Sequence, residues 1–132
     1  MADLTPAFNV ARKDAQREIH WSASGLWDAA KMSELFSELL DISRPFRHDK
    51  MGFRVLGDLR DFAVQPREIA ALIEQSQRAS AQYGVDRMAI VCSSVLVKQQ
   101  FRRVSEALEC EYFTDKSEAI AWLRSPRKEQ AA

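Results

Sequence analysis

The most constraining feature of this sequence is the stretch Phe53–Phe62, followed at once by a helix start at Gln65-Pro66. The stretch begins as a mostly apolar strand and ends in acidic and basic residues, and a helix opens a few residues later. The same strand-to-helix pattern recurs at Met88–Gln100 and at Cys110–Leu123. Repeated strand–helix units predict a small α/β domain, although they do not predict a reaction.

Two alternating segments precede these units. Phe8–Arg12 and Arg17–Trp21 each alternate apolar and polar residues across a short link, which predicts a β-hairpin. Ser22–Gly25 breaks the alternation and is expected to lead into a helix. That helix is predicted from apolar residues at helical spacing: Met32, Leu35, Phe36, Leu39 and Leu40. With Pro45 inside it, the segment Arg44–Lys50 is expected to be a basic loop.

The later helices have recognisable ends. Pro66 fits the first helical position with Gln65 as the cap, and Gly84 fits the C-terminal end of the same helix. Asp115 with Glu118 three residues on resembles a capping box for the last helix. The buried stripe of the helix after Pro66 is expected to comprise Ile69, Leu72, Ile73, Ser76, Ala79 or Ser80, and Tyr83.

The element order is therefore strand, strand, helix and then three strand–helix units. Right-handed crossovers predict an α/β fold with a mixed, mainly parallel sheet of about five strands and about four helices. We assign the domain to residues 8–124 and a short polar C-terminal tail to residues 125–132. Met88–Cys92 is apolar throughout, as in a central strand covered on both faces. If all helices gather on one face, either a second subunit, as in a homodimer, or the first strand pair folding over would cover the other.

The balance of basic and acidic residues limits the classes of partner that we expect. Nineteen basic and nineteen acidic residues leave a formal charge of +0, which argues against a nucleic-acid partner. No apolar run approaches the length of a membrane span, so no membrane insertion is expected. Met1–Pro6 has neither a basic leader nor an apolar signal core, and Cys92 and Cys110 are expected to be buried and unpaired. Cytoplasmic residence is the expectation.

Five segments together carry a family resemblance: Gly25–Asp28, Val55–Phe62, Met88–Val91, Gln100–Arg103 and Tyr112–Leu123. In this order they resemble the STAS superfamily (sulfate transporter and anti-sigma factor antagonist). They are most similar to its small stand-alone bacterial proteins of unknown function. The resemblance spans residues 8–124. It implies a non-enzymatic regulatory or protein-interaction domain that binds a protein partner or itself.

One loop departs from that resemblance. Anti-sigma factor antagonists carry an Asp-Ser-Ser-Gly type sequence after the matching strand, and its serine is phosphorylated. Here the loop reads Asp61-Phe-Ala-Val-Gln65-Pro66, without Ser or Thr, so the phosphoswitch is not implied. Lipid-binding CRAL-TRIO domains share a similar sheet, but this chain lacks their larger helical lid. A carrier of a small lipid or nucleotide-like ligand is the alternative function.

Two groups of polar residues are candidate binding sites. Asp58, Arg60 and Asp61 crowd the carboxyl end of a predicted parallel strand, where ligands usually bind. They either form a rim for a partner or ligand, or only cap amides and pair with each other. Ser93 and Ser94 lie at a strand-to-helix junction. They either bind phosphate or become phosphorylated there, or act as a plain helix cap.

The sequence contains no recognisable catalytic machinery. His20 and His48 lie in different elements and neither neighbours a cysteine at metal-ligand spacing, so no metal site is expected. Cys92 lies in an apolar strand, where burial disfavours the thiolate that a nucleophile needs. Glycine-rich phosphate loops and Gly-x-Ser-x-Gly elbows are absent from the sequence. We therefore expect neither an enzyme nor a bound cofactor.

Overall fold

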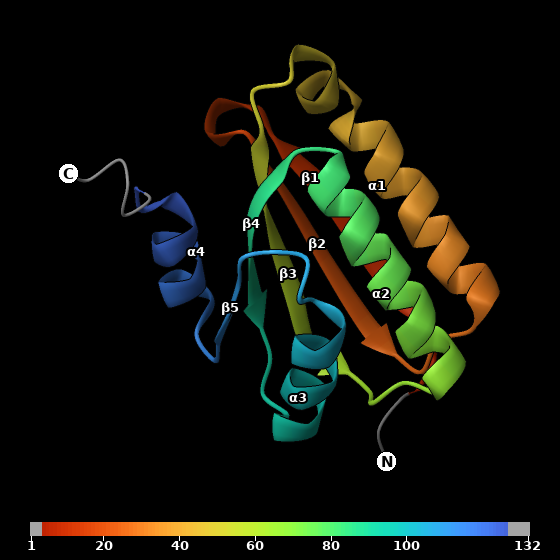
Figure 1. Ribbon diagram of the computed structural model, residues 1–132. Helices are drawn as coiled ribbons and strands as arrows, with labels where there is room; N and C mark the ends of the chain where they lie inside the picture. Colours follow the sequence, from red (N-terminus) through yellow and green to blue (C-terminus); the bar gives the residue numbers. More distant parts are fainter. Residues whose placement is uncertain (1–3, 127–132) are drawn as a thin grey trace.

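The computed structural model describes residues 4–126, which form one five-stranded sheet with helices on both faces (Figure 1). The strands are β1 (Ala7–Lys13), β2 (Glu18–Gly25), β3 (Phe53–Phe62), β4 (Val85–Val91) and β5 (Cys110–Phe113). The helices are α1 (Ala29–Asp49), α2 (Arg67–Gln82), α3 (Val95–Val104) and α4 (Lys116–Arg124), with a 3-10 turn at Asp14–Gln16. The predicted fold class and element order are confirmed.

The sheet follows the chain in the spatial order β1-β2-β3-β4-β5. β1 and β2 form the antiparallel hairpin, whereas β2–β3, β3–β4 and β4–β5 are parallel pairs. Because the order is sequential, the sheet has no point at which the strand order reverses, and no crevice of that kind forms. The carboxyl ends of β2, β3 and β4 instead meet along one edge.

The two faces of the sheet are covered differently. Helices α1, α2 and α3 lie on one face and α4 lies on the other, over β3, β4 and β5 (Figure 1). The α4 face is a small separate core, in which Leu56, Ala89 and Val91 pack against Ala119 and Leu123. The second face of β4 is therefore covered within the chain. A second subunit is therefore not needed to cover this strand, and the homodimer stays a prediction.

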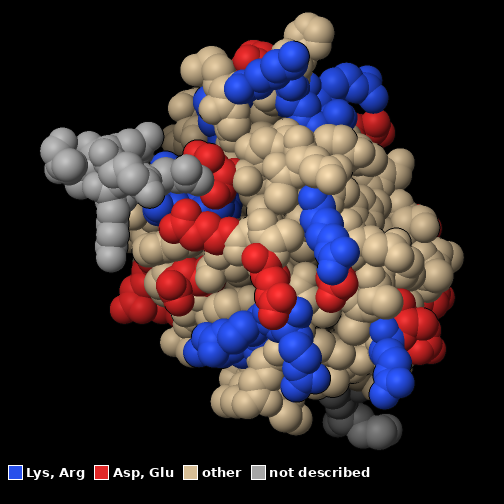
Figure 2. Space-filling model, in the orientation of Figure 1, with Lys and Arg blue, Asp and Glu red and all other residues tan. Residues whose placement is uncertain are grey.

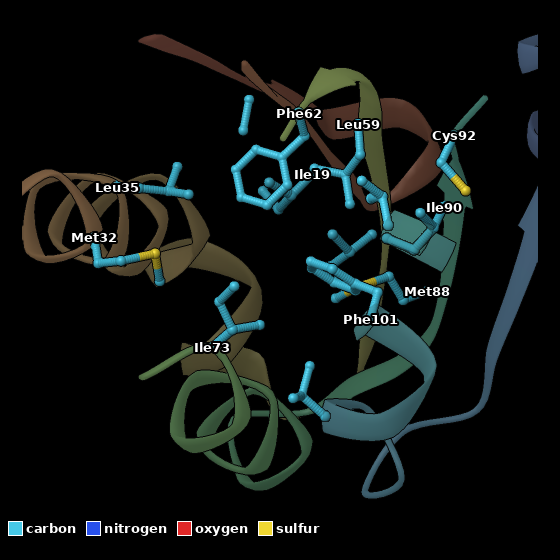
Figure 3. Close-up of a cluster of buried hydrophobic side chains, with 14 of the residues drawn as sticks. Ile19, Met32, Leu35, Leu59, Phe62, Ile73, Met88, Ile90, Cys92 and Phe101 are labelled. Carbon is cyan, nitrogen blue, oxygen red and sulfur yellow. The ribbon is translucent and has the colours of Figure 1, made fainter. Parts of the chain in front are cut away.

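The main core lies between the sheet and the first three helices (Figure 3). Met32 and Leu35 from α1, Ile73 from α2 and Phe101 from α3 all point toward the sheet residue Ile19 and its neighbours. These residues fall at the helical spacing that predicted the helices. In α2, however, the predicted stripe is only partly right. Buried Gln77 replaces Ser76, and Tyr83 is exposed.

The predicted loop Arg44–Lys50 is wrong, because α1 continues through Pro45 to Asp49. Proline removes one intrahelical hydrogen bond, a cost that contacts of the last two turns offset here. Phe46 is buried against Phe53, with ring centroids 5.6 Å apart. Arg17 donates to the Phe46 carbonyl and forms a two-pronged pair with Asp49, at 2.7 Å for both bonds. Tertiary packing thus outweighs the local proline signal.

Further boundaries differ from the prediction, and β4 is Val85–Val91 rather than Met88–Cys92. β2 does not end at Trp21 but continues through Ser22–Gly25, with an irregular register between Ser22 and Ser24. Pro66 rather than Gln65 occupies the N-cap position of helix α2, without a side-chain capping hydrogen bond, and Gln65 is buried. The predicted ends at Gly84 and after Arg124 agree with the structure, and Asp115 caps α4 through the Ser117 and Glu118 amides. Most of the predicted tail, residues 127–132, lies outside the described residues.

A buried acid joins the end of α4 to β2. Glu18 is 1% exposed and accepts two hydrogen bonds from Arg124, at 2.9 and 3.0 Å. The His20 ring nitrogen lies 2.9 Å from the same carboxylate. Burial alone raises the pKa of Glu18, but the hydrogen bonds from Arg124 and His20 outweigh it and leave the pKa lowered. The ionised form is thus favoured by folding.

This arrangement predicts an acid-sensitive component of stability. Glu18 stabilises the fold above the ordinary carboxyl pKa of about 4.3, and the stabilisation is lost as the pH falls through the lowered folded-state pKa. In urea denaturation at several pH values, Glu18→Gln should flatten the fall of the unfolding free energy on acidification. Glu111→Gln, at an exposed position on β5, is the control and should keep the wild-type slope. Equal slopes in the two variants would contradict the prediction.

Candidate functional site

The candidate site lies along the carboxyl edge of the parallel strands, at the lower end of the molecule in Figure 1. β2, β3 and β4 end at this edge, and α1, α2 and α3 begin there, since each follows one of these strands. β3 pairs with β4 only as far as Asp58, opposite Val91. Asp58, Arg60, Asp61, Ser93 and Ser94 therefore all lie where two adjacent strands end. We call these five residues the rim.

Within the rim, Asp58 and Arg60 are partners of each other. Arg60 donates to both carboxylate oxygens of Asp58, at 2.9 and 2.6 Å, and its backbone amide adds a third bond at 3.2 Å. The hydrogen bond from the Arg60 side chain is the main reason that the pKa of Asp58 is lowered. Both groups stay charged, and about half of the Arg60 side chain is exposed. The pair presents a fixed cation and anion.

Asp61 lies outside this pair and faces the first hairpin. Together with Asp58 it lines a shallow polar depression on the sheet face that α4 leaves open. Side chains of Asn9, Ser22 and Ser24 complete the polar part of its lining. The polar side chains that line the depression carry mainly oxygen atoms, which suit hydrogen-bond donors of a partner.

The two serines of the rim have different structural roles. The hydroxyl of Ser94 accepts a hydrogen bond from the Val97 amide at 3.2 Å and caps α3. Ser93 is exposed beside it. The sequence allowed either a phosphate-related role or a plain helix cap at these serines. Ser94 is the helix cap. The geometry gives its hydroxyl a structural task without requiring a bound anion.

Gln65, which the sequence predicted only as a helix cap, organises this edge. The side chain of Gln65 is 4% exposed and accepts a hydrogen bond from the Trp27 amide at 2.8 Å. Its amide nitrogen donates to the Gly25 carbonyl at 3.0 Å and to the Ala63 carbonyl at 2.7 Å. Gln100 on α3 bonds both the backbone amide and the carbonyl of Gln65, at 2.8 and 2.9 Å. We call this arrangement the Gln65 latch.

The latch ties three neighbouring segments together: the β2–α1 loop, the β3–α2 turn and the first turns of α3. It occupies the same turn in which the resemblance places a phosphorylatable serine in other proteins. No local pattern reveals it, because Gln100 lies 35 residues away and Gln65 reads equally well as a helix cap. A glutamine that can satisfy several backbone groups at once needs the folded loops around it.

A second candidate site is an apolar cavity between the sheet and α1 and α2, about 80 Å³ in volume. Met32, Leu35, Ile73 and Phe101 line it from the helices, around the open centre of Figure 3. A cavity with such a lining stays dry and can hold small apolar groups. Partly exposed lining residues on both helices, including Leu40, Ser76 and Ser80, bring it to the surface between α1 and α2.

The thiols and histidines form no reactive centre in the described part of the chain. Cys92 and Cys110 are both free, and burial raises the pKa of each thiol, to about 11 for Cys110. Across residues 4–126, no three His, Cys, Asp or Glu side chains come together as metal ligands. Nor does this part of the chain include a helix with the length and apolar character needed to cross a bilayer.

Comparison with known proteins agrees with this architecture. Residues 19–124 match the model of the SpoIIAA-like family. A structure of an uncharacterized protein of the DUF3478 family with a SpoIIAA-like fold, from Shewanella loihica PV-4, is similar at a TM-score of 0.68 and 16% identity. The alignment covers 93% of this chain and 98% of that one.

A second similar structure is an anti-sigma factor antagonist from Mycobacterium paratuberculosis, with a TM-score of 0.60 and 10% identity. The alignment covers 90% of this chain and 96% of that one. At these identities both structures show a shared fold and nothing more specific. Among curated proteins, none matches the chain significantly.

Proposed function

The chain belongs to the SpoIIAA-like family, and we propose that it is a non-enzymatic regulatory domain that docks a protein partner through its rim. The proposal includes cytoplasmic action without a cofactor. The fold is shared with an anti-sigma factor antagonist, a class of protein that acts by binding another protein. The rim lies at the edge where loops of an α/β sheet are free to meet a partner.

The observation that carries this proposal is the Gln65 latch. It holds the β2–α1 loop, the β3–α2 turn and the start of α3 in one arrangement through buried and partly buried hydrogen bonds. The edge can therefore bind a partner without a conformational change in these segments, and no phosphate is needed to order them. We propose that binding at this edge is constitutive rather than switched at the β3–α2 turn.

A comparison of purified baits in extract of the source cell tests the rim. The test variant carries Asp58→Ala, Arg60→Ala and Asp61→Ala. The control variant carries Glu38→Ala, Asp41→Ala and Arg44→Ala on α1, which also removes two acids and one base and breaks an exposed ion pair. A partner recovered by the wild type and by the control should be lost from the rim variant. Equal recovery of every partner by all three baits would remove the rim from the proposal.

A serine variant separates constitutive binding from phosphorylation. Aspartate caps helices as well as serine does, so Ser94→Asp should leave stability unchanged. If binding is constitutive, the same variant should also recover the partner as the wild type does. Loss or gain of a partner in Ser94→Asp and also in Ser93→Asp, at unchanged stability, would instead indicate a switch at the serines.

The apolar cavity favours a second candidate function, a carrier of a small lipid-like ligand. Its lining suits an alkyl group and not a nucleotide, because only a few polar side chains reach it. Native mass spectrometry of protein purified gently from its own host should then show a bound mass. Ile73→Phe, which fills the cavity, should lose that mass, whereas Ala71→Phe on the exposed side of α2 should keep it. Wild-type protein without any bound mass would remove the carrier.

A further inference from the structure

The outer face of α3 begins with two exposed apolar residues. Val95 is 67% exposed and Leu96 is 64% exposed, in the first turn of the helix. They add nothing to the core, which α3 meets through Val97, Phe101 and Val104 on its opposite face. Exposed apolar side chains adjoining a candidate binding edge are typical of a contact surface.

The same face of α3 ends with basic residues. Helical spacing places Arg102 two turns from Val95, and Arg103 two turns from Leu96, in one exposed stripe. Lys98 flanks the stripe, and α3 contains no acidic residue. In Figure 2 the region of α3 shows Lys and Arg side chains above an uncharged lower tip. We call the surface formed by Val95, Leu96, Arg102 and Arg103 the α3 face.

The arginines of this face differ from most other arginines of the described chain. Most of those other arginines form ion pairs, including Arg12, Arg17, Arg60 and Arg78. Within residues 4–126, no ion pair forms with Lys98, Arg102 or Arg103. The end of the helix dipole favours bases at the last turn, but it accounts neither for Lys98 nor for the apolar first turn.

We propose that the α3 face docks an acidic amphipathic helix of the protein partner. This inference rests on the proposed function and names the chemistry of its partner. A helix with apolar side chains at one end of its contact stripe and Glu or Asp at the other would cover Val95 and Leu96. Its acids would at the same time pair with Arg102, whose guanidinium lies 5.3 Å from the centroid of the Tyr112 ring, and with Arg103. The ten residues of α3 span about 15 Å, enough for roughly three turns of a partner helix.

The experiment uses a labelled model peptide of about fourteen residues, four helical turns, with Leu and Glu on one face. A peptide of the same composition in scrambled order is its control. Titration of the full chain should shift NMR signals of α3 with the patterned peptide, and binding should weaken as salt is raised. Arg102→Glu with Arg103→Glu should weaken binding by at least about tenfold, and Val95→Ser with Leu96→Ser by a similar factor.

Matched variants and probes decide the outcome. Lys13→Glu with Arg44→Glu, and Met51→Ser at another exposed apolar position, should bind the peptide as the wild type does. Equal binding of the scrambled peptide, or shifts that avoid α3, would overturn the inference. So would tight binding of anionic phosphatidylglycerol vesicles in place of the peptide, which would indicate a membrane surface. So too would loss of self-association in the α3 variants by sedimentation, which would indicate a second copy. The rim experiment keeps its own result in each case, because it does not use the peptide.

Discussion

Replacing Gly25 with alanine is expected to destabilise the protein by about 3 kcal/mol, more than any other single added methyl group at its four glycines. Gly25 has φ +85°, a conformation that costs alanine about 1–2 kcal/mol. A Cβ placed there would also lie 2.3 Å from the backbone oxygen of Thr5. The chain before β1 would have to move, and the hydrogen bond from the Leu26 amide to the Leu4 carbonyl would be lost with it.

Gly84→Ala is the control that separates these two costs. Gly84 also has a positive φ, +102°, but the nearest atom to an added Cβ is 3.8 Å away. Its replacement should therefore cost only the conformational part, about 1 kcal/mol. Urea denaturation at neutral pH measures both changes, and the difference of about 2 kcal/mol reports the contact with Thr5. The same loss of stability in both variants would mean that the N-terminal segment yields without cost.

The strand–helix units were predictable because their signals are local. Each parallel strand is a short apolar run, and each following helix shows its own stripe and start, as at Asp115 and Ser94. The order of the units then leaves few topologies that obey right-handed crossovers. The candidate rim was predictable for the same reason, since residues that follow parallel strands must meet at one edge of the sheet.

Features that depend on contacts between distant segments were not predictable. The helix through Pro45 is held by Phe53 and Arg17, which lie in other elements. Whether α4 covers the free face of β4 depends on the buried cluster around Leu123, and no periodicity within α4 reveals which face it meets. Likewise Gln77 is a polar residue on the buried side of an apolar stripe. Its hydrogen bond to Ser105, at 2.9 Å, satisfies it there, and this bond joins residues that are far apart in the sequence. Local patterns thus identified the elements but not all of their partners.

Replacing Gln65 with alanine is expected to destabilise the fold by about 3 kcal/mol, because it removes three hydrogen bonds to the backbone and leaves the buried Trp27 amide without this acceptor. The Trp27 amide and the Gly25 carbonyl both lose a hydrogen bond in a buried setting. Gln65→Glu keeps the size and the acceptor for Trp27, but at neutral pH its carboxylate would face the Gly25 and Ala63 carbonyls without a proton to donate. It should therefore lose at least as much stability as the alanine variant at pH 7, in urea denaturation.

Gln100→Ala distinguishes the centre of the latch from its outer part. Gln100 is only partly buried, so water can replace its bonds to the Gln65 backbone, and the loss should be about 1 kcal/mol. If the latch also shapes the rim, Gln100→Ala should lower partner recovery even though the protein stays folded. That result would link loop geometry to binding through a residue outside the rim. Full partner recovery by Gln100→Ala, together with a small loss of stability in Gln65→Ala, would show that the loops hold their arrangement without the latch.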